Sequence, residues 1–460
     1  QAIYLGAANN RVAYLKQDGG NMVLSGELVF SYPTAVNTQS ELHQTGGTLT
    51  GIYNWRVGNN AGSYGRIIKT GGHLAHSGYV LGVGFSSTGT VHGVNASELR
   101  MQGGTMKLSG AAGLSVSYNA GSYGYAEFSG GVTDLSKKSI TVGKGGGTGL
   151  LRVTGGWVTN VYTVAVGSDA TSTGRLELSG GVLGVNDVAS SSTGVDSSTV
   201  LLDGGILRHE GTYGHPDFIH ADVKRVALTT NGAVVQLQGY DCTIPAKLVN
   251  ETGHAGAFTK LGPTRLTLSS PDSAFTGRIT VAEGQLRVTG GVYLTGGVVV
   301  EDGAWLNLYD SSSAYATIHD ARTASGTISR IDGTMTLAPA GALTCGDGAV
   351  VGGGGTLAGG LVVEAGGALG ADKDGTGGAL DVTGAVDFAA GAGVALTGYV
   401  SEELETPVAV LNAAGGIAVA APLTVSLDGI VKPSLRADLN AEGTTLSVRF
   451  QPIGTVLCVR

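Results

Sequence analysis

The densest group of chemically reactive side chains lies in the segment RHEGTYGHPDFIHADVKR. Three histidines and three carboxylates occur there close together, namely His209, Glu210, His215, Asp217, His220 and Asp222. Side chains of these types can ligate a metal ion or act as general acid and base. Their spacing matches neither HExxH nor another known ligand pattern. We therefore interpret the segment as a solvated loop and predict no metal ion and no cofactor.

Carboxylates elsewhere in the chain raise the possibility of polysaccharide hydrolysis, which uses a pair of them on either side of the scissile bond. The acids are dispersed, and Asp169, Asp187, Asp196 and Asp203 fall in different turns or strands. We therefore predict that the protein is not an enzyme and assign no catalytic residue. A carbohydrate-binding or polysaccharide-degrading protein, with acids grouped on one face, is the alternative.

Two glycine-rich stretches superficially suggest nucleotide binding. VGKGGGTG (Val142–Gly149) lacks the Gly-Lys-Ser/Thr ending of a phosphate-binding loop, and no helical pattern follows it. GGGGTLAGG (Gly352–Gly360) lacks these features too. We interpret both stretches as turns between strands.

The composition excludes several classes of protein. Glycine accounts for 80 of the 460 residues, well above the usual share of about 7 %, while 42 % of the chain is apolar. That apolar content argues against a disordered chain. The net charge of −8 and the scattered basic residues argue against nucleic-acid binding. No apolar run is long enough for a membrane span, and Cys242, Cys345 and Cys458 form no CxxC pair.

A repeat explains the glycines. Gly-Gly pairs begin at positions 19, 46, 71, 103, 130, 155, 180 and 204, so they recur at nearly regular intervals. Between them lie short runs that alternate apolar and polar residues, as in Leu176–Ser179, which is the pattern of a strand. A unit this small cannot bury its own apolar face and must stack on its neighbours. We predict an all-β protein, a single elongated right-handed parallel β-helix with glycine-rich rungs of about 25 residues.

The hexapeptide NAGSYG occurs at Asn60–Gly65 and again at Asn119–Gly124. The copies precede the Gly-Gly pairs at 71 and 130, and one further pair lies between them, so they are two repeat units apart. We expect both copies to form the same turn on alternate rungs. Tyr64 and Tyr123 would then project from one edge of the β-helix, where we predict a speculative contact surface for another chain.

A longer segment is similar to a known family. FTKLGPTRLTLSSPDSAFTGRITVAEGQLRV (Phe258–Val288) resembles the passenger-associated repeat of bacterial autotransporters. The agreement lies at Thr259–Gly262, Leu266–Ser269, Phe275–Gly277 and Val281–Gly284, and Pro263 departs from the small residue usual at its position. With the glycine-rich segments that follow it, the similar portion covers roughly Val200 to Phe450. The resemblance implies an exported β-helix at the bacterial cell surface or outside the cell, here without the family's outer-membrane barrel.

These observations predict four segments. Regular Gly-Gly rungs occupy 1–211, irregular rungs or a loop 212–256, passenger-like glycine-rich rungs 257–400, and closing strands 401–460. The first residues, IYLGAANNRVAYLKQDGG, align with the back half of a repeat unit, so we expect the chain to start within a rung. Either upstream rungs are absent, or the open end stacks on another copy.

We therefore predict a non-enzymatic exported structural or adhesive β-solenoid. It would be a cell-surface or extracellular fibre component that self-associates end to end, in a head-to-tail filament. Surface glycans or a host cell surface are further predicted partners. We predict neither nucleic acid nor a membrane span.

Overall fold

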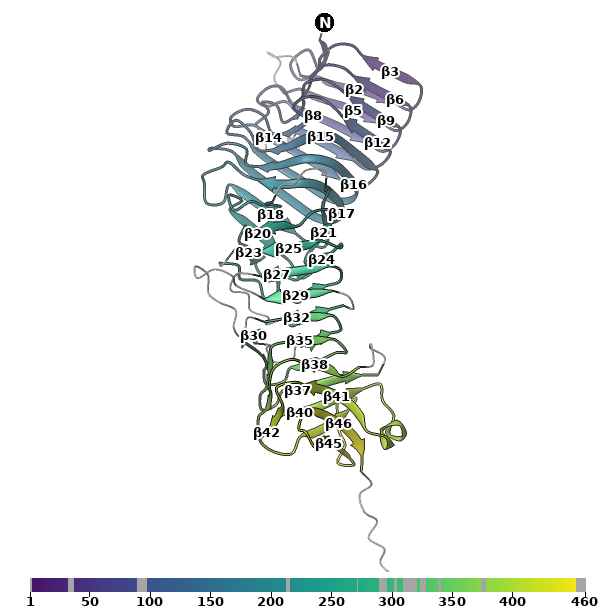
Figure 1. Cartoon of the computed structure of the whole chain (residues 1–460). Helices are drawn as coiled ribbons and strands as arrows, with labels where there is room; N and C mark the ends of the chain where they lie inside the picture. The colour runs from purple at the N-terminus through teal and green to yellow at the C-terminus, as the bar shows by residue number, and fades with distance from the viewer. Residues whose placement is uncertain are drawn as a thin grey trace, which may run out of the picture. The chain divides into compact units, whose positions relative to one another are not determined.

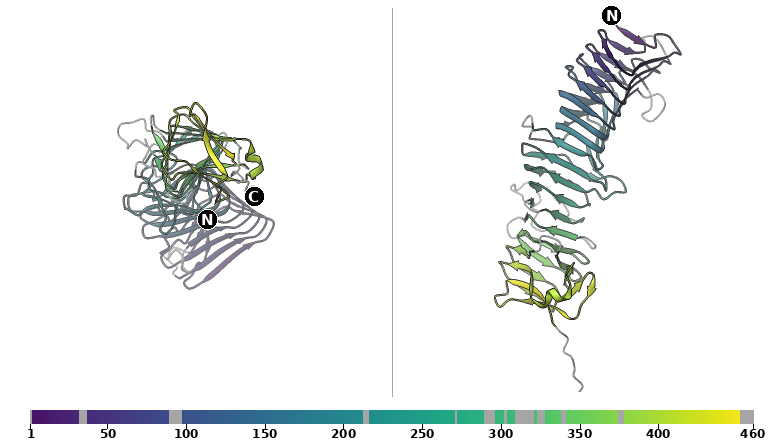
Figure 2. Two further views of the ribbon diagram at one scale, coloured as in Figure 1. Left: turned by 90° about the horizontal axis from the view of Figure 1, so that it is seen from below. Right: turned by 90° about the vertical axis from the view of Figure 1, so that its right-hand side faces the viewer.

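In the computed structural model, the described residues are 2–31, 37–88, 97–211, 216–270, 272–288, 296–301, 304–308, 321–322, 328–337, 341–373 and 378–451. They form two compact units, Gln1–Gly256 and Ala257–Arg460. Each unit consists of short β-strands stacked as rungs, nearly all of them parallel (Figure 1, Figure 2). Within the described residues the one helical element is the 3-10 helix η1 (Ser401–Glu405). The predicted all-β parallel solenoid is confirmed, and the predicted four-segment division stays a prediction.

The strands of the first unit form three parallel ladders, which we number 1 to 3. Ladder 1 contains β2 (Val12–Gln17), β5 (Gln39–Gln44), β8 (Tyr64–Lys69), β11 (Ser97–Met101), β14 (Tyr123–Phe128), β18 (Ser198–Leu202), β20 (Arg225–Leu228) and β23 (Leu248–Asn250). Ladder 2 contains β3 (Asn21–Leu24), β6 (Thr48–Gly51), β9 (His73–His76), β12 (Thr105–Leu108), β19 (Ile206–His209) and β21 (Ala233–Leu237). Ladder 3 contains β1 (Ile3–Leu5), β4 (Leu28–Phe30), β7 (Trp55–Val57), β10 (Leu81–Val83) and β13 (Leu114–Val116). Three long strands continue through the corners and take part in more than one ladder. β15 (Val132–Val142) belongs to ladders 2 and 3, and β16 (Thr148–Val166) and β17 (Thr173–Ala189) belong to all three. A further strand, β22 (Cys242–Ile244), lies near the end of the unit.

The second unit has three ladders of its own, numbered 4 to 6. Ladder 4 contains β24 (Phe258–Leu261), β26 (Ile279–Val281), β28 (Val298–Val300), β31 (Ile328–Ile331), β34 (Val350–Gly352), β37 (Ala368–Asp372), β40 (Gly393–Thr397) and β43 (Thr424–Leu427). Ladder 5 contains β25 (Arg265–Leu268), β27 (Gln285–Val288), β29 (Trp305–Leu308), β32 (Thr334–Thr336), β35 (Thr356–Ala358), β38 (Leu380–Val382) and β41 (Val408–Ala413). Ladder 6 contains β30 (Ala321–Arg322), β33 (Ala342–Cys345), β36 (Gly360–Val363), β39 (Val386–Phe388) and β42 (Ile417–Val419). Antiparallel strands then follow, namely β44 (Ile430–Val431), β45 (Leu435–Leu439) and β46 (Thr445–Phe450).

The interior of the first unit is made of columns of like residues. Leu42 pairs in register with Ile67, and Ile67 pairs with Leu99, and all three side chains are fully buried. A parallel register places equivalent residues of successive rungs directly above one another, so a repeated apolar position becomes a continuous core. The offset between the paired residues Gln39 and Tyr64 equals the offset between Gly46 and Gly71, so the rung has the length that the sequence repeat predicts.

The Gly-Gly pairs form the corner between ladders 1 and 2, and they stack as predicted. A Cβ atom on Gly46 would lie 2.1 Å from the carbonyl oxygen of Asp18 in the preceding rung. Gly47 has a φ of +67°, in the left-handed region that favours glycine. The first glycine of a pair therefore makes room for the neighbouring rung, and the second turns the chain.

Candidate functional site

The histidine-rich segment does not form one loop. His209 is fully buried at the end of β19, where its ring and that of Phe218 form a T-shaped contact at a centroid distance of 5.4 Å. His215 lies outside the described residues. The interpretation of the whole segment as a solvated loop is therefore wrong for His209. Its place at an inward position of a ladder, which the sequence pattern did not indicate, accounts for the burial.

Glu210 and His220 of this segment contact side chains of earlier rungs. Glu210 accepts hydrogen bonds from Thr159 Oγ1 at 2.8 Å and from an Arg208 Nη atom at 2.9 Å. His220 Nε2 lies 3.2 Å from a carboxylate oxygen of the buried Asp187. This contact, although burial opposes it, raises the pKa of His220 above its usual value. Among the residues that the structure describes, no three His, Cys, Asp or Glu side chains are grouped so that they could hold a metal ion.

The dispersed aspartates differ in their contacts. Asp187 contacts His220, Asp203 accepts a hydrogen bond from Asn231 Nδ2 at 2.9 Å, and Asp196 is exposed. Each carboxylate thus has its own surroundings, and none of these contacts joins two of them in the pair that glycoside hydrolysis uses.

The backbone amides of the turn VGKGGGTG bind a carboxylate of the protein itself, that of Asp169. The amide nitrogens of Gly145 and Gly146 donate to the carboxylate of Asp169 in the next rung, at 2.5 and 3.3 Å. Burial of Asp169 opposes ionisation, but these amides and the hydroxyl of Ser172 outweigh it and lower the pKa of Asp169. The successive backbone amides form an anion-binding concavity. The interpretation as a turn holds, and the aspartate occupies the concavity that a ligand would need.

The two NAGSYG copies occupy equivalent places. Arg66 pairs with Glu98 and Ser97 with Gly124, so the register puts Tyr64 and Tyr123 at one position of ladder 1, two rungs apart. Tyr64 is 5 % exposed, and burial, with the nearby Glu98 carboxylate, raises its pKa to about 12. Tyr123 is half-buried, and burial raises its pKa too. Tyr64 thus offers little surface to another chain, and the contact surface at these tyrosines stays a prediction.

The serine of NAGSYG explains why this turn repeats. Ser63 and Ser122 are both buried, and each forms a hydroxyl–hydroxyl hydrogen bond, with Ser31 at 2.9 Å and Ser117 at 2.8 Å. Buried polar groups need such partners. The motif is therefore a structural turn with a satisfied interior hydroxyl.

A network of ion pairs on the outer face of ladder 1 is the main feature that the sequence analysis missed. Glu98 contacts Arg100 at 2.5 Å and Arg66 at 3.4 Å, and these arginines reach Glu127 and Glu41 on the flanking rungs at 3.1 and 3.8 Å. On the next two rungs, Arg152 and Arg175 both contact Glu177, at 2.6 and 2.7 Å. Alignment of the repeat units by their Gly-Gly pairs would have revealed the alternation of Glu and Arg at these positions. The contacts of Glu98 and its arginines tie four successive rungs together from outside the core.

Two buried lysines hold corner carbonyls, one in each unit. Lys69 donates to the carbonyl oxygens of Gly71 and Gly72, and burial lowers the pKa of Lys69 to about 8. Lys260 donates to the carbonyl oxygens of Leu261, Gly262 and Glu283, at distances of 3.0, 2.6 and 3.1 Å. Both amines are occupied in closing a corner of the solenoid.

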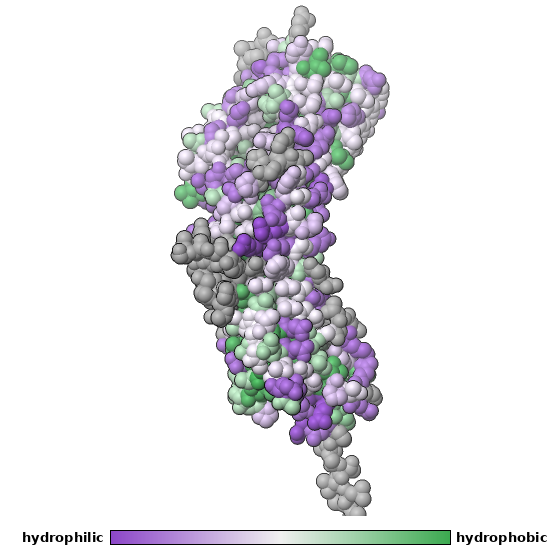
Figure 3. Space-filling model, in the orientation of Figure 1, coloured by the Kyte–Doolittle hydropathy of each residue, from purple (hydrophilic) through white to green (hydrophobic). Residues whose placement is uncertain are grey.

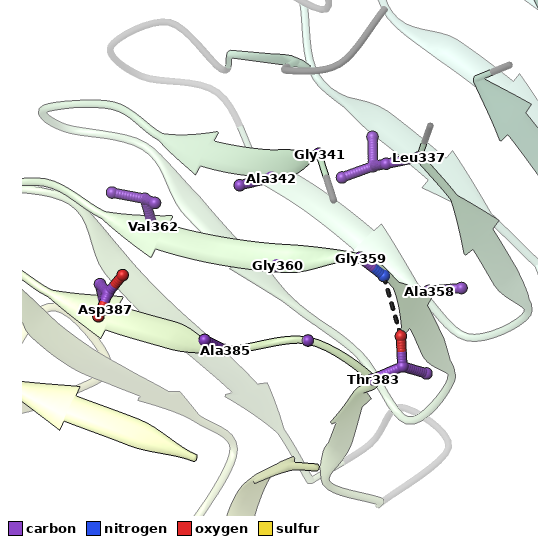
Figure 4. Close-up of a pocket in the computed structure, with 11 residues that line it drawn as sticks. Leu337, Gly341, Ala342, Ala358, Gly359, Gly360, Val362, Thr383, Ala385 and Asp387 are labelled. Atoms are coloured by element: carbon purple, nitrogen blue, oxygen red, sulfur yellow. Dashed lines mark hydrogen bonds between the residues drawn. The ribbon is translucent and has the colours of Figure 1, made fainter. Parts of the chain in front are cut away.

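Among the described residues of the second unit, two hollows meet at Thr383. One has a volume of about 430 Å³ and lies between ladders 5 and 6 (Figure 4), where Gly359 N donates to Thr383 Oγ1 at 3.1 Å. Its lining also includes Leu337, Ala385 and the carboxylate of Asp387. The other has a volume of about 500 Å³ and is lined by Asp381, Asn412, Thr444 and Thr445, among others. Small side chains create the first hollow, because glycine and alanine leave its corner unfilled.

The chain matches no protein-family model, no curated protein and no solved structure. The β-solenoid implied by the resemblance to autotransporter passengers is present, whereas membership of that family stays a prediction. Within the described residues, no helix has the length and apolar character needed to span a membrane.

Proposed function

We propose that the protein is a non-enzymatic structural or adhesive β-solenoid, exported to the cell surface or beyond it, where it forms part of a fibre. The observation that carries this proposal is that the reactive side chains of the protein form ion pairs and hydrogen bonds within the solenoid itself. Glu98, Asp169 and Lys69 all engage groups of the solenoid itself. Charged groups that satisfy one another contribute to stiffness rather than to the binding of a substrate.

The outer surface supports the same proposal. The face visible in Figure 3 mixes hydrophilic and hydrophobic residues, and its hydrophobic patches are small and separate. Networks of partly buried ion pairs contribute more than isolated exposed pairs, since their members already share fixed positions. A surface of this kind suits a stalk or fibre that must stay folded without a compact domain around it.

Immunogold electron microscopy of the cells that make the protein tests the proposal. The expected result is label outside the cell envelope, on fibres or on the surface. Label confined to the cell interior would contradict export and, with it, the fibre function.

A carbohydrate-binding or polysaccharide-degrading protein is the second candidate, and the two adjoining hollows favour it. Their volumes fall within the range of ligand sites, and Asp381 and Asp387 place carboxylates in their linings. Soluble polysaccharides can be tested by affinity electrophoresis and by the release of reducing ends. Binding or cleavage that Asp387→Asn abolishes would establish this candidate, and retention of both by the variant would remove the hollow from consideration.

A further inference from the structure

Trp157 is a half-exposed aromatic residue on the outer face of ladder 2. It lies in β16 and is 48 % exposed, and its register partner on the preceding rung, Val132, is 45 % exposed. The equivalent positions on the two rungs before Val132 are polar, namely Thr105 and His73. A large apolar group left open on an otherwise polar column is a candidate contact for a ligand.

Side chains from two rungs further along the chain hold the indole ring. The guanidinium carbon of Arg208 lies 4.9 Å from the centroid of the Trp157 ring, and Arg208 is only 9 % exposed. An Nη atom of Arg208 donates to Glu210 at 2.9 Å, and the same carboxylate oxygen accepts from Thr159 Oγ1 at 2.8 Å. A buried and anchored cation therefore covers one side of the ring. We call Trp157, Arg208 and Glu210 the indole platform.

Gly184 makes room for the indole platform. It pairs in register with Arg208, and a Cβ atom there would lie 1.6 Å from Glu210 Oε1. The φ of Gly184 is not in the left-handed region, so its backbone conformation does not require glycine. The absent side chain instead allows the Glu210 carboxylate to reach back across the rung to Thr159.

Two hydrogen-bonding atoms of the indole platform have no partner among the described residues. Trp157 Nε1 donates to none of them, whereas the similarly exposed Trp305 of the second unit donates to a threonine hydroxyl at 2.9 Å. Both contacts of Glu210 use Oε1, and its Oε2 accepts from no described residue although the side chain is only 10 % exposed. Asp134, the register partner of Thr159, adds a second carboxylate nearby.

This combination of groups fits a neutral sugar. A pyranose has a face of C–H groups that packs on an indole, and hydroxyls that donate to carboxylates or accept from an indole N–H. Arg208 and Glu210 neutralise each other, so the platform has no excess positive charge that would attract a phosphate or a sulfate. Arg208 also occupies the position over the ring that a cationic ligand would take.

We infer that the indole platform is a carbohydrate-binding site for a neutral hexose unit of a glycan. The sugar stacks on the exposed part of the Trp157 ring, and the indole N–H and Glu210 Oε2 bind its hydroxyls. This inference rests on the adhesive form of the proposed function and names its ligand class and its contact surface. The site lies in the first unit, whereas the hollows at Thr383 belong to the second.

Fluorine NMR of the full chain labelled with fluorotryptophan tests the inference. The chain has three tryptophans, so the spectrum should hold three signals, which single Trp→Phe variants assign. The probes are cellohexaose, maltohexaose and mannohexaose. At least one of them should move the Trp157 signal in a saturable way, with a dissociation constant between about 0.1 and 10 mM, and leave the signals of Trp55 and Trp305 in place. High salt should not change this affinity, because the ligand is uncharged.

Variants separate stacking from hydrogen bonding, with calorimetry as the measure of binding. Trp157→Ala should weaken binding of that sugar by at least about tenfold in dissociation constant, while thermal unfolding stays unchanged. Glu210→Gln should weaken it by about threefold, because an amide oxygen accepts hydrogen bonds less strongly than a carboxylate. Trp305→Ala is the matched control, because it removes an equally exposed indole from an outer strand face, and it should bind like the wild type.

Several outcomes would overturn the inference. They are a Trp157 signal that none of the three sugars moves at up to about 10 mM, an equal loss of binding in Trp305→Ala, and a response to a lysine-containing peptide that high salt removes. The last of these would assign the ring to a cationic ligand. Surface label on cells without sugar binding would leave the proposed function standing without this site. Sugar binding with label confined to the cell interior would instead contradict export and leave the site.

Discussion

Ladder 1 of the first unit joins its rungs through charged side chains, whereas the corner between ladders 5 and 6 of the second unit has small residues and a hollow. On ladder 1, Glu98 and Glu177 each contact two arginines from different rungs. Between ladders 5 and 6, glycine and alanine line an open hollow of about 430 Å³ (Figure 4). Parallel strand pairing is common to both units, so this pairing alone is enough to build a rung. A network of ion pairs between rungs is an addition found on ladder 1, whereas the hollow between ladders 5 and 6 has the single hydrogen bond between Gly359 and Thr383 among its described lining residues.

Rung length varies within the second unit. The pair Ile279 and Val298 is closer together in the sequence than Gln39 and Tyr64 of the first unit, whereas Val299 and Arg330 are farther apart. A shorter rung leaves fewer residues for its corners. Open corners should therefore respond differently to substitution from corners against which a neighbouring rung packs.

The largest difference is expected between a glycine against which the neighbouring rung packs and a glycine at an open position. Gly131 has a φ of +73°, and a Cβ atom there would lie 2.4 Å from the carbonyl oxygen of Gly104. Gly131→Ala should lower the free energy of unfolding by about 3–5 kcal/mol, because backbone strain and a backbone clash combine. Gly378→Ala in the second unit, with its nearest atom at 3.4 Å, should change it by less than about 1 kcal/mol. Chemical denaturation followed by circular dichroism measures both, and equal losses would contradict the comparison.

The ion-pair network should give the next largest effect. Glu98→Gln removes the shared carboxylate, which is 8 % exposed, and leaves Arg66 and Arg100 without it. We expect a loss of about 1–2 kcal/mol in the free energy of unfolding, diminished by high salt. In the second unit Glu301→Gln breaks a contact between side chains that are about 40 % exposed, and the loss should stay below about 1 kcal/mol. A Glu98→Gln variant as stable as the wild type at low salt would show that the network adds nothing.

A smaller effect depends on pH. The pKa of His220 is raised in the folded protein by Asp187, so the folded state binds the proton more tightly than the unfolded state. The resulting stabilisation is fully present below the unfolded pKa of about 6.5 and is lost as the pH rises through the folded pKa. His220→Asn should therefore be less stable than the wild type by about 0.5–1 kcal/mol at pH 5.5, with a smaller deficit at pH 8.5. A deficit that is the same at both pH values would exclude the charged pair as its cause.

The smallest effect is expected in the hollow of the second unit. Ala385 lines it and is exposed, so Ala385→Val adds two methyl groups to open space. The free energy of unfolding should change by less than about 0.5 kcal/mol. A loss above about 2 kcal/mol would mean that the corner is packed as tightly as the corners of the first unit.

The sequence predicted the ladders better than it predicted their outer faces. Gly46 and Gly71 mark successive corners, and their spacing equals the register of the strands that precede them. The length of a rung equals the spacing of its corner glycines along the chain, so it can be read from the sequence alone. Glu41 and Arg66 lie one repeat unit apart in sequence and become neighbours only when the rungs stack. The contact between Asp169 and the amides of Gly145 and Gly146 also joins successive rungs, so it could not be predicted from the sequence.

By itself the sequence determined the period, the strand pattern and the corners, because glycine at a recurrent position and alternating apolar residues constrain the backbone directly. Only the tertiary structure decided which side chains are buried and which are paired. His209 and Tyr64 lie in turn-like stretches of the sequence and are nevertheless enclosed. Burial and pairing depend on what the rungs above and below contribute. That information is spread over segments one repeat unit apart, and stacking alone brings them together.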